Sequence, residues 1–554
     1  MAYKISTENS IKDNNLKLTA DKIIQNLDQL REEGKKSRRR WIWELMQNAK
    51  DVKNKYGKVT INIELNDQEF AFTHNGDPFS INNITCLIQQ VSSKPSDSSQ
   101  TEITGKFGTG FIATHLLSDV ITVKGVVKEE GETPKRFNLK LDRSGETSEE
   151  LMPVIGESLN EISQIDNDDL FPIDPNYEEK REEDDLDNVF SYPIFEANKT
   201  TAIDAIEDLL KTLPLTMAFN DKIKKVSINN AIKNTHYTYL CETKKKDNGI
   251  SHAHISIIDE HNKIEKEHFY IIKSQDEPNF DLAIKVDGFA KPTLIANEDS
   301  SPFLYRDFPL IGSNKFYFPF ILNGKSLNPT DRRDGIFLIG NTKKTTHNRA
   351  ILQAAIKESA NFVDYLISLE ACNLFVTALS SLPDYNFDED EDFECKDWYI
   401  ENIQKYYRKE LISKHIHSKA KTLSEIKFPY DEMAKGKLDA LRDVCAPIFG
   451  KGCIPEKSEY EIWLNFIGPY EEKDTWGVQL YVDIEDILEL LQENKKLDQI
   501  TLFPTEIGEL PVERLTWLNS FYQFLIDVYG KIPDNYEIVP NENNIFKKFS
   551  TLFI

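Results

Sequence analysis

The stretch that decides the fold is WIWELMQNAKDVKNKYG at residues 41–57. Apolar residues recur in it at helical spacing and Gly57 is a stop signal, so we predict a helix that ends there. Glu44, Asn48 and Asp51 stand at positions i, i+4 and i+7, which places all three side chains on one face. By itself this polar stripe fits an ordinary solvated helix face, so a functional site needs further signals.

A glycine-rich loop, GKFGTGF at residues 105–111, runs into the helix-forming segment IATHLLS at 112–118. Glycines let backbone N–H groups approach an anion, and the N-terminus of a helix adds a favourable dipole. The loop is not a P-loop, because no Lys-Ser/Thr pair follows the last glycine. It is not a dinucleotide fingerprint either, because its glycines do not follow the order G-x-G-x-x-G.

Between these two segments lies a predicted strand pair with a glycine at its end. VTINIEL (59–65) and QEFAFTH (68–74) read as strands joined by a short turn. The second strand ends at His74, and Asn75-Gly76-Asp77-Pro78-Phe79 follow it. A glycine directly after a strand lets the chain turn closely around a flat ligand.

The order and spacing of the three segments resemble those of the GHKL ATPases, the superfamily of gyrase, heat-shock chaperones, histidine kinases and MutL. The family pattern is E-x-x-x-N-[AS]-x-[DA], then D-x-G-x-G, then G-x-x-G-x-G. It corresponds here to ELMQNAKD (44–51), HNGDP (74–78) and GKFGTGF (105–111). The motif core covers residues 40–126.

Other segments look more specifically like bacterial ATP-binding proteins related to the sacsin N-terminal module. They are RWIWELMQNAKDV (40–52), FTHNGDPF (72–79) and LDRSGETSEEL (141–151), with a looser likeness at 308–338. Such bacterial proteins often belong to antiviral defence systems, which is an implication of the resemblance alone. The resemblance implies ATP and Mg²⁺ as cofactors.

The resemblance also implies roles for individual residues. Glu44 would orient and deprotonate the attacking water, Asn48 would ligate Mg²⁺, and Asp51 would lie near the water network beside the adenine. Lys94 would lie in a Ser-rich lid and contact a phosphate, the alternative being an ordinary solvated lysine. The glycine loop would offer its backbone N–H groups to the phosphates through Gly105, Lys106, Phe107, Gly108, Thr109, Gly110 and Phe111.

One departure from the family pattern concerns the residue that recognises the adenine base. The family's adenine-reading aspartate falls at His74, two residues before the glycine that corresponds to Gly76. A neutral histidine has one acceptor nitrogen and can substitute for the carboxylate with less selectivity, and Asp77 is an alternative. Our hypothesis is that ATP is the ligand, with GTP as the competitor to exclude.

A basic residue from a second domain touches the γ-phosphate in the relatives that couple domains. NPTDRRDG (328–335) is the corresponding source here, through Arg332 and Arg333, with Lys325 nearby. A cation beside a triphosphate offsets transition-state charge. The alternative is a surface turn with local ion pairs.

We therefore expect an α+β multidomain protein. Residues 1–200 would form a Bergerat-type α/β sandwich that binds ATP, with an acidic insertion at 150–188. The polar stretch 128–188 that contains it is expected to be solvated and partly disordered. Residues 201–370 would form a mixed α/β coupling domain with a mostly antiparallel sheet, and 371–554 a mainly helical region. The strands expected in the coupling domain are 224–230, 235–241, 254–259, 268–273, 282–289 and 315–322.

The composition excludes several classes of function. Lys and Arg number 67 against 92 Asp and Glu, a formal net charge of 67 − 92 = −25, which argues against a main surface that grips nucleic acid. No apolar run reaches about 18 residues, so no membrane span is expected. The six cysteines form no C-x-x-C pair, so we expect free thiols in a cytoplasmic protein.

The sequence thus predicts an ATP-dependent conformational switch, with homodimerisation on ATP binding and a client or companion protein at the C-terminal helical region. The alternative is a nucleotide sensor or scaffold with little or no turnover. A histidine kinase fits poorly because no dimerising helix pair with a phosphoacceptor histidine precedes the motifs.

Overall fold

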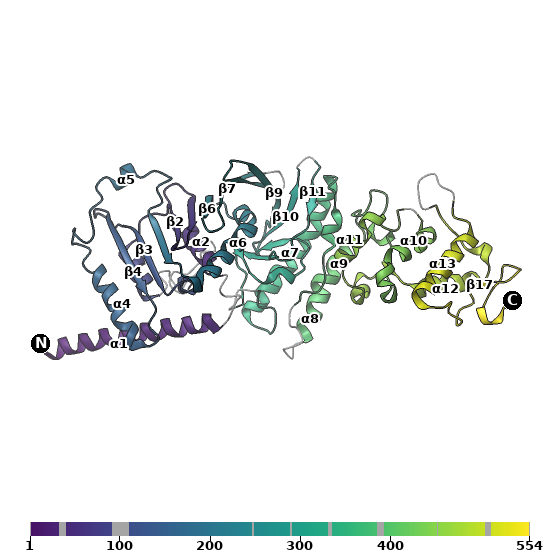
Figure 1. Cartoon of the computed structure of the whole chain (residues 1–554), viewed down its shortest axis with the longest axis horizontal. Coiled ribbons are helices and arrows are strands. Elements are labelled where there is room, and N and C mark those ends of the chain that lie inside the picture. Colours follow the sequence, from purple (N-terminus) through teal and green to yellow (C-terminus); the bar gives the residue numbers. More distant parts are fainter. Residues whose placement is uncertain are drawn as a thin grey trace. The chain divides into compact units, whose positions relative to one another are not determined.

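The computed structural model describes residues 2–32, 40–90, 110–245, 249–288, 291–330, 335–384, 393–450, 452–504 and 511–552. The chain divides into two compact units (Figure 1). The first unit holds residues 1–287, 297–315 and 321–351, and the second holds 288–296, 316–320 and 352–554. The molecule is a mixed α/β protein with one large mixed sheet, which agrees with the expected α+β class.

The first half of the first unit alternates helices and strands. Its elements are α1 (Ala2–Glu32), α2 (Trp41–Asp51), β1 (Val59–Leu65), β2 (Glu69–His74), α3 (Ile81–Gln89), the 3₁₀ helix η2 (Phe111–Leu116), β3 (Val120–Val127), β4 (Lys135–Asp142), α4 (Ser148–Ile162), α5 (Tyr177–Lys180), β5 (Asn188–Pro193) and α6 (Glu196–Phe219).

The second half of this unit is mainly strands. They are β6 (Ile223–Asn230), β7 (Thr235–Lys245), β8 (Ile250–Asp259), β9 (Ile264–Lys273), β10 (Asp281–Asp287), β12 (Leu304–Arg306), β13 (Phe308–Pro309) and β14 (Ile321–Asn323), with the short η3 (Ser313–Lys315). Helix α7 (Lys343–Ser368) contains the last boundary between the units.

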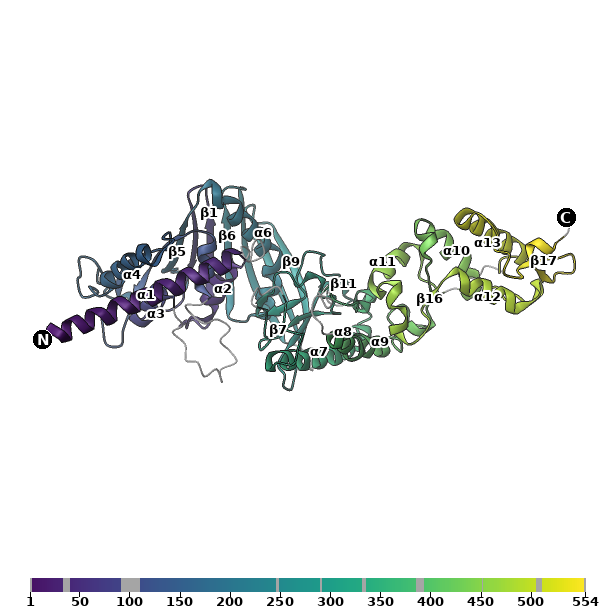
Figure 2. The same cartoon turned by 90° about the horizontal axis from the view of Figure 1, so that it is seen from below.

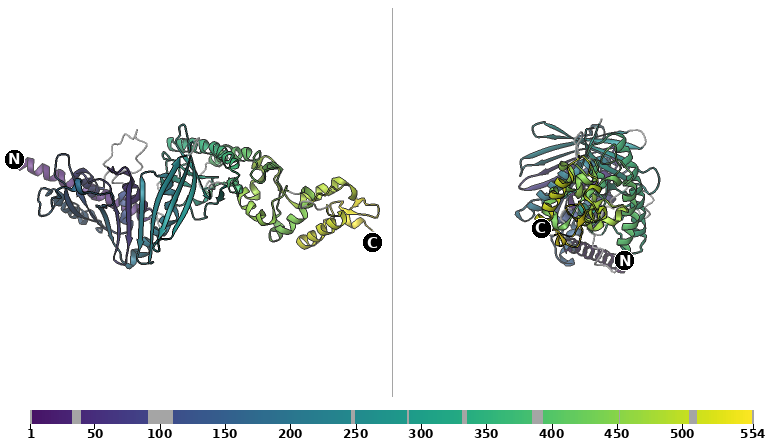
Figure 3. Two further views of the ribbon diagram at one scale, coloured as in Figure 1. Left: turned by 90° about the horizontal axis from the view of Figure 1, so that it is seen from above. Right: turned by 90° about the vertical axis from the view of Figure 1, so that its right-hand side faces the viewer.

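These strands form one sheet in the order β13-β12-β14-β10-β9-β8-β7-β6-β1-β2-β5-β3-β4, and they lie side by side in Figure 3. β1 pairs with β6 in parallel, whereas the successive pairs β6–β7, β7–β8, β8–β9 and β9–β10 are antiparallel, as expected for 201–370. The sheet therefore continues across residue 200, and the three-part division of the chain stays a prediction.

Burial alternates along the strands that flank the first motifs. Phe70, Phe72 and His74 are buried on β2, and Phe137, Leu139 and Leu141 are buried on β4. Alternate residues of a strand point to opposite faces, so one face of this sheet is covered. α2 contacts β1 and η2, α4 contacts β4, and α1 runs along α4 (Figure 2).

Three sequence expectations differ from the structure. α2 ends at Asp51, because Val52 is extended and Gly57 lies in a turn at a φ of 77°. The strand expected at 315–322 is reduced to Ile321–Asn323, since Pro319 has no N–H to donate to a sheet. Residues 150–188, for which we expected partial disorder, include most of α4, all of α5 and the first residue of β5.

The second unit is mainly helical, as expected for residues 371–554. Its elements are β11 (Thr293–Ile295), η4 (Leu374–Ala378), α8 (Phe393–Tyr399), the π-helix η5 (Ile400–Gln404), α9 (Lys405–Leu411), η6 (Leu423–Glu425), β15 (Phe428–Pro429), η7 (Glu432–Lys437), α10 (Leu438–Phe449), α11 (Lys457–Ile467), η8 (Tyr470–Trp476), β16 (Tyr481–Val482), α12 (Ile484–Asn494), η9 (Leu497–Gln499), α13 (Arg514–Tyr529), β17 (Val539–Pro540), β18 (Phe546–Lys547) and η10 (Phe549–Thr551). Within the described ranges, no helix has the length and apolarity that crossing a membrane requires.

Candidate functional site

The polar stripe of α2 is buried, which rules out the solvated-face explanation. Residues 41–50 are all buried, and Glu44 and Asn48 are only 2% and 7% exposed. The Asp51 side chain is buried as well. Removing a carboxylate from water costs free energy unless charged or hydrogen-bonding partners compensate, so we look for such partners around Glu44 and Asp51.

Glu44 lies against the end of the glycine-rich loop. A Cβ atom built on Gly110 would stand 2.2 Å from Glu44 Oε2, so a larger residue here would have to push this carboxylate aside. On the other side, Arg40 Nε donates to Glu44 Oε1 at 3.0 Å. The structure therefore brings together the helix motif and the last glycine of the loop motif, which the sequence separates by more than sixty residues.

Asn48 stands one turn further along α2. Its Nδ2 atom is buried and has no hydrogen-bond partner in the part of the chain that the structure describes. A buried amide without a partner costs free energy, of the order of 1–3 kcal/mol, unless a ligand or water satisfies it. The unpartnered Asn48 Nδ2 and the contact between Gly110 and Glu44 lie one turn apart on α2.

Two cations, the buried Lys50 and the partly buried Arg306, lie near the carboxylates of α2. Lys50 Nζ lies 2.5 Å from Asp307 Oδ2 and 3.6 Å from Asp51 Oδ1. Burial lowers the pKa of Arg306 from its usual range, while the charges of Asp307, Asp51 and Glu44 act to raise it. Arg306 therefore lies within the electrostatic reach of the predicted site.

The sequence reasoning missed Arg306 and Lys50. Arg306 lies in the largely apolar run FLYRDFPL (303–310), where an ionisable residue is unusual and signals a buried partner, whereas Lys50 lies in the mixed run WELMQNAKD (43–51), which gives no such signal. The basic residues that were chosen, Arg332 and Arg333, lie outside the described residues. So do Lys94, Gly105, Lys106, Phe107, Gly108 and Thr109.

The turn after β2 holds His74 in a defined tautomer. The Gly76 N–H donates to His74 Nδ1 at 3.0 Å, and burial with the nearby Arg181 charge lowers the His74 pKa to about 3. The ring is therefore neutral at physiological pH and carries its proton on Nε2. We expected the acceptor nitrogen of His74 to bind a nucleotide base, but this nitrogen, Nδ1, already accepts the hydrogen bond from Gly76. A ligand that reaches the protonated Nε2 would have to supply a hydrogen-bond acceptor.

Gly76 is required by packing at this turn. A Cβ atom on it would lie 2.8 Å from the His74 ring and from a methyl carbon of Val52. This close approach explains the glycine without a ligand. Access for a flat base beside Gly76 stays a prediction.

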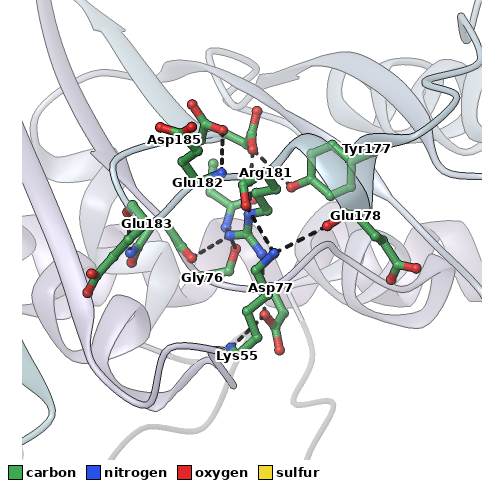
Figure 4. Close-up of polar contacts among 12 residues, drawn as sticks. Lys55, Gly76, Asp77, Tyr177, Glu178, Arg181, Glu182, Glu183 and Asp185 are labelled. Carbon is green, nitrogen blue, oxygen red and sulfur yellow. Dashed lines mark hydrogen bonds and ion pairs between the residues drawn. The ribbon is translucent and has the colours of Figure 1, made fainter.

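Arg181, in the acidic insertion at 150–188, holds the same turn through hydrogen bonds of its guanidinium group (Figure 4). Its Nη2 donates to the carbonyls of Asn75 and Gly76, the latter at 2.6 Å, and its Nη1 lies 3.4 Å from Asp77 Oδ1. Asp77 also accepts from the Lys55 N–H at 3.1 Å. Asp77 is thus engaged in holding the turn, and nothing in the sequence around Arg181 marked it among its acidic neighbours.

Phe111, which follows the loop, packs into the core. It is buried and contacts the ring of Phe190 at 5.7 Å between centroids. Its side chain is structural, so its predicted contribution to phosphate binding is limited to its backbone N–H.

The described residues contain no group of three or more His, Cys, Asp or Glu side chains placed to hold a metal ion. A single amide ligand such as Asn48 fits Mg²⁺ brought in by a nucleotide, because Mg²⁺ keeps waters and substrate phosphates as most of its ligands. No protein-family model matches the chain, and no curated protein is similar to it at a significant level.

Proposed function

We propose that this chain binds ATP with Mg²⁺ and hydrolyses it, as a conformational switch of the GHKL type related to the heat-shock chaperones and sacsin. The observation that carries the proposal is the buried stripe of α2 against Gly110. A carboxylate and an amide with an unpartnered Nδ2 line one helix face beside the last glycine of the loop.

The residues would divide the work as follows. Glu44 would hold the attacking water and accept its proton through the carboxylate oxygen next to Gly110. Asn48 would hold Mg²⁺ through Oδ1 and offer Nδ2 to a phosphate oxygen. Arg306 would offset the negative charge of the triphosphate. Bound Mg²⁺ supplies Lewis-acid stabilisation of the phosphate oxygens.

A second candidate is a nucleotide sensor with little or no turnover. The observation that favours it is the ion pair between Arg40 and Glu44, with 3.0 Å between Nε and Oε1. A carboxylate held by a guanidinium is a weaker base than a free one. In this case ATP binding would change the conformation without rapid hydrolysis.

Two measurements test these functions. Titration with a fluorescent ATP analogue and Mg²⁺ measures binding, and phosphate release measures turnover. If the chain is an ATPase, Glu44→Gln lowers turnover by about 100-fold with binding retained, and Asn48→Ala weakens Mg²⁺-dependent binding. Glu64→Gln, at an exposed carboxylate on β1, is the matched control and leaves both unchanged.

The outcomes separate the proposals. Saturable binding with background phosphate release that Glu44→Gln does not alter identifies a sensor. Absence of saturable ATP binding contradicts both functions. Competition between ATP and GTP tests the base, and a clear preference for GTP contradicts the adenine hypothesis.

We also propose, on the resemblance alone, homodimerisation when ATP binds, a client or companion protein at the C-terminal helical region, and a role in bacterial antiviral defence. Sedimentation velocity with and without a non-hydrolysable ATP analogue tests the dimer. A monomer under both conditions contradicts it.

A further inference from the structure

A hollow of about 710 Å³ on the second unit combines aromatic and acidic side chains. We call it the tyrosine groove, after Tyr317, Tyr430, Tyr470 and Tyr481 in its lining. Tyr430 stacks on Tyr470 with 5.4 Å between ring centroids, and Tyr481 meets Tyr470 edge-on at 5.5 Å. The three rings form one cluster at the base of the groove.

Tyr317 adds a strained aromatic to the same lining. Its backbone φ is 50°, in the left-handed region that a bulky residue rarely adopts. Such strain persists where the surroundings enforce it, and it occurs often at ligand-binding positions. It is independent of the contacts within the tyrosine cluster.

The charged lining is mostly negative. Four glutamates, Glu432, Glu461, Glu471 and Glu472, face one basic residue, Lys435. Glu472 is committed to the interior, because it pairs with the buried Arg408 at 2.8 Å. The other three carboxylates are exposed, and Glu432 lies 3.4 Å from Lys435, so an unbalanced negative charge faces the solvent.

The aromatic faces also favour cations. Lys473, which is not in the lining of the groove, holds its ammonium 4.1 Å from the centre of the Tyr470 ring. Cations bind the faces of aromatic rings through the ring quadrupole. Lys473 also donates to the Tyr470 hydroxyl, so this cation is held within the chain, and the attraction for a further positive side chain comes from the exposed carboxylates Glu432, Glu461 and Glu471.

Apolar side chains complete the chemistry of the groove. Leu379, Leu382, Leu438 and Leu464 line it, and the side chain of Met433, next to Glu432, is largely exposed. A small organic cation held by the exposed carboxylates would leave these apolar surfaces uncovered. A peptide with basic and apolar side chains covers both kinds of surface.

We propose that the tyrosine groove binds an extended, basic segment of another protein, with a Lys or Arg side chain against the tyrosine cluster and apolar residues against the leucines. The proposal goes beyond nucleotide binding and does not depend on it. The experiments below use no nucleotide, so their failure leaves the proposed ATPase untouched.

Panning of a phage-displayed random dodecapeptide library on the full chain tests the proposal. The expected result is enrichment of peptides that combine Lys or Arg with apolar residues, and binding that weakens as salt screens the carboxylates. Enrichment of acidic or purely apolar peptides, or no enrichment, contradicts it.

Charge reversal locates the site. The double variant Glu461→Lys, Glu471→Lys should weaken binding of the selected peptide by about tenfold in fluorescence anisotropy. Glu459→Lys is the matched control, because Glu459 is exposed on the same helix, α11, and lines a different hollow. Equal loss in both variants, or loss in neither, contradicts the groove as the site.

A second copy of the chain is the competing occupant. Sedimentation velocity of the protein without nucleotide distinguishes it. A monomer supports a foreign peptide, whereas a dimer that the double variant dissociates and the control does not would overturn the proposal.

Discussion

At the scale of single residues, the contact between Gly110 and Glu44 is the sharpest feature of the site. Gly110 has an ordinary right-handed backbone, with φ at −85°, so an alanine here meets no conformational barrier but would displace the Glu44 carboxylate. A side chain added at position 110 would therefore act directly on the position of the Glu44 carboxylate.

We predict that Gly110→Ala displaces the Glu44 carboxylate. The expected result is loss of phosphate release, with a free energy of unfolding lower by about 1–3 kcal/mol from overpacking. The measurements are phosphate release and urea unfolding. Gly436→Ala is the control, because a Cβ atom there meets nothing within 4 Å. Full activity of Gly110→Ala would contradict the role of this contact.

Two buried histidines predict an acid-sensitive stability. Burial lowers the pKa of His74 and of His115 to about 3, with Arg181 and Arg143 adding to the respective shifts. An unfolded histidine titrates near 6.5, so below this pH the unfolded chain binds protons that the folded chain does not. Stability is complete above about pH 6.5 and falls as the pH decreases towards 3.

The slope of this fall is testable. Each histidine contributes up to about 1.4 kcal/mol per pH unit between its two pKa values. His74→Gln with His115→Gln lowers stability at neutral pH but flattens the dependence, measured by urea unfolding from about pH 7 to about pH 4. His261→Gln, at a side chain 82% exposed, should leave the slope unchanged. An unchanged slope in the double variant contradicts the assignment.

At the scale of secondary-structure elements, buried ion pairs connect segments that are distant in sequence. The pair of Lys50 and Asp307 joins α2 to the turn between β12 and β13, and both side chains are buried. Removal of one partner leaves an uncompensated buried charge.

We predict that Lys50→Met lowers the free energy of unfolding by about 3–5 kcal/mol. Lys50→Met with Asp307→Asn should cost less than the sum of the single variants, because neither charge is then left alone. Asparagine also tolerates the left-handed φ of 60° at this position. Urea unfolding of the two single variants and the double variant completes a double-mutant cycle. If their changes in the free energy of unfolding are strictly additive, the two charges are not coupled.

The clamp by Arg181 gives a second prediction at this scale. Its guanidinium reaches the carbonyls of Asn75 and Gly76 together, which a lysine ammonium cannot reproduce with the same geometry. Arg181→Lys should lower stability by about 1–3 kcal/mol and speed amide exchange in the turn 75–77. Arg136→Lys, at a half-exposed arginine paired with Asp174 and Asp187, should change stability by about 1 kcal/mol or less.

At the scale of the whole molecule, the two compact units predict separate unfolding transitions. Each unit has its own core, which contains Trp41 in the first unit and Trp517 in the second. If ATP binds at α2, Mg²⁺ and ATP should raise the Tm of one transition and leave the other unchanged in scanning calorimetry. A shift of both transitions by the same amount would contradict a binding site confined to the first unit.

Local patterns predicted most of the secondary structure around the motifs. β1 and β2 lie where alternation placed them, and α2 begins at the predicted residue. Where a prediction from the sequence differs from the structure, the cause is a local contact that the amino-acid composition does not reveal. Acidic residues at 176–188 suggested disorder, but Arg181, Tyr177 and Asn188 within that run make the buried contacts that order it.

The sequence by itself determined the helix that carries Glu44, Asn48 and Asp51, because spacing along a helix decides which side chains share a face. It also determined the mixed α/β class, because strand and helix periods are local. Only the tertiary structure decided that this face is buried, that Gly110 meets Glu44, and that Lys50 and Arg306 oppose its carboxylates. Burial and ion pairing depend on which distant segments pack together, and no local pattern encodes that choice.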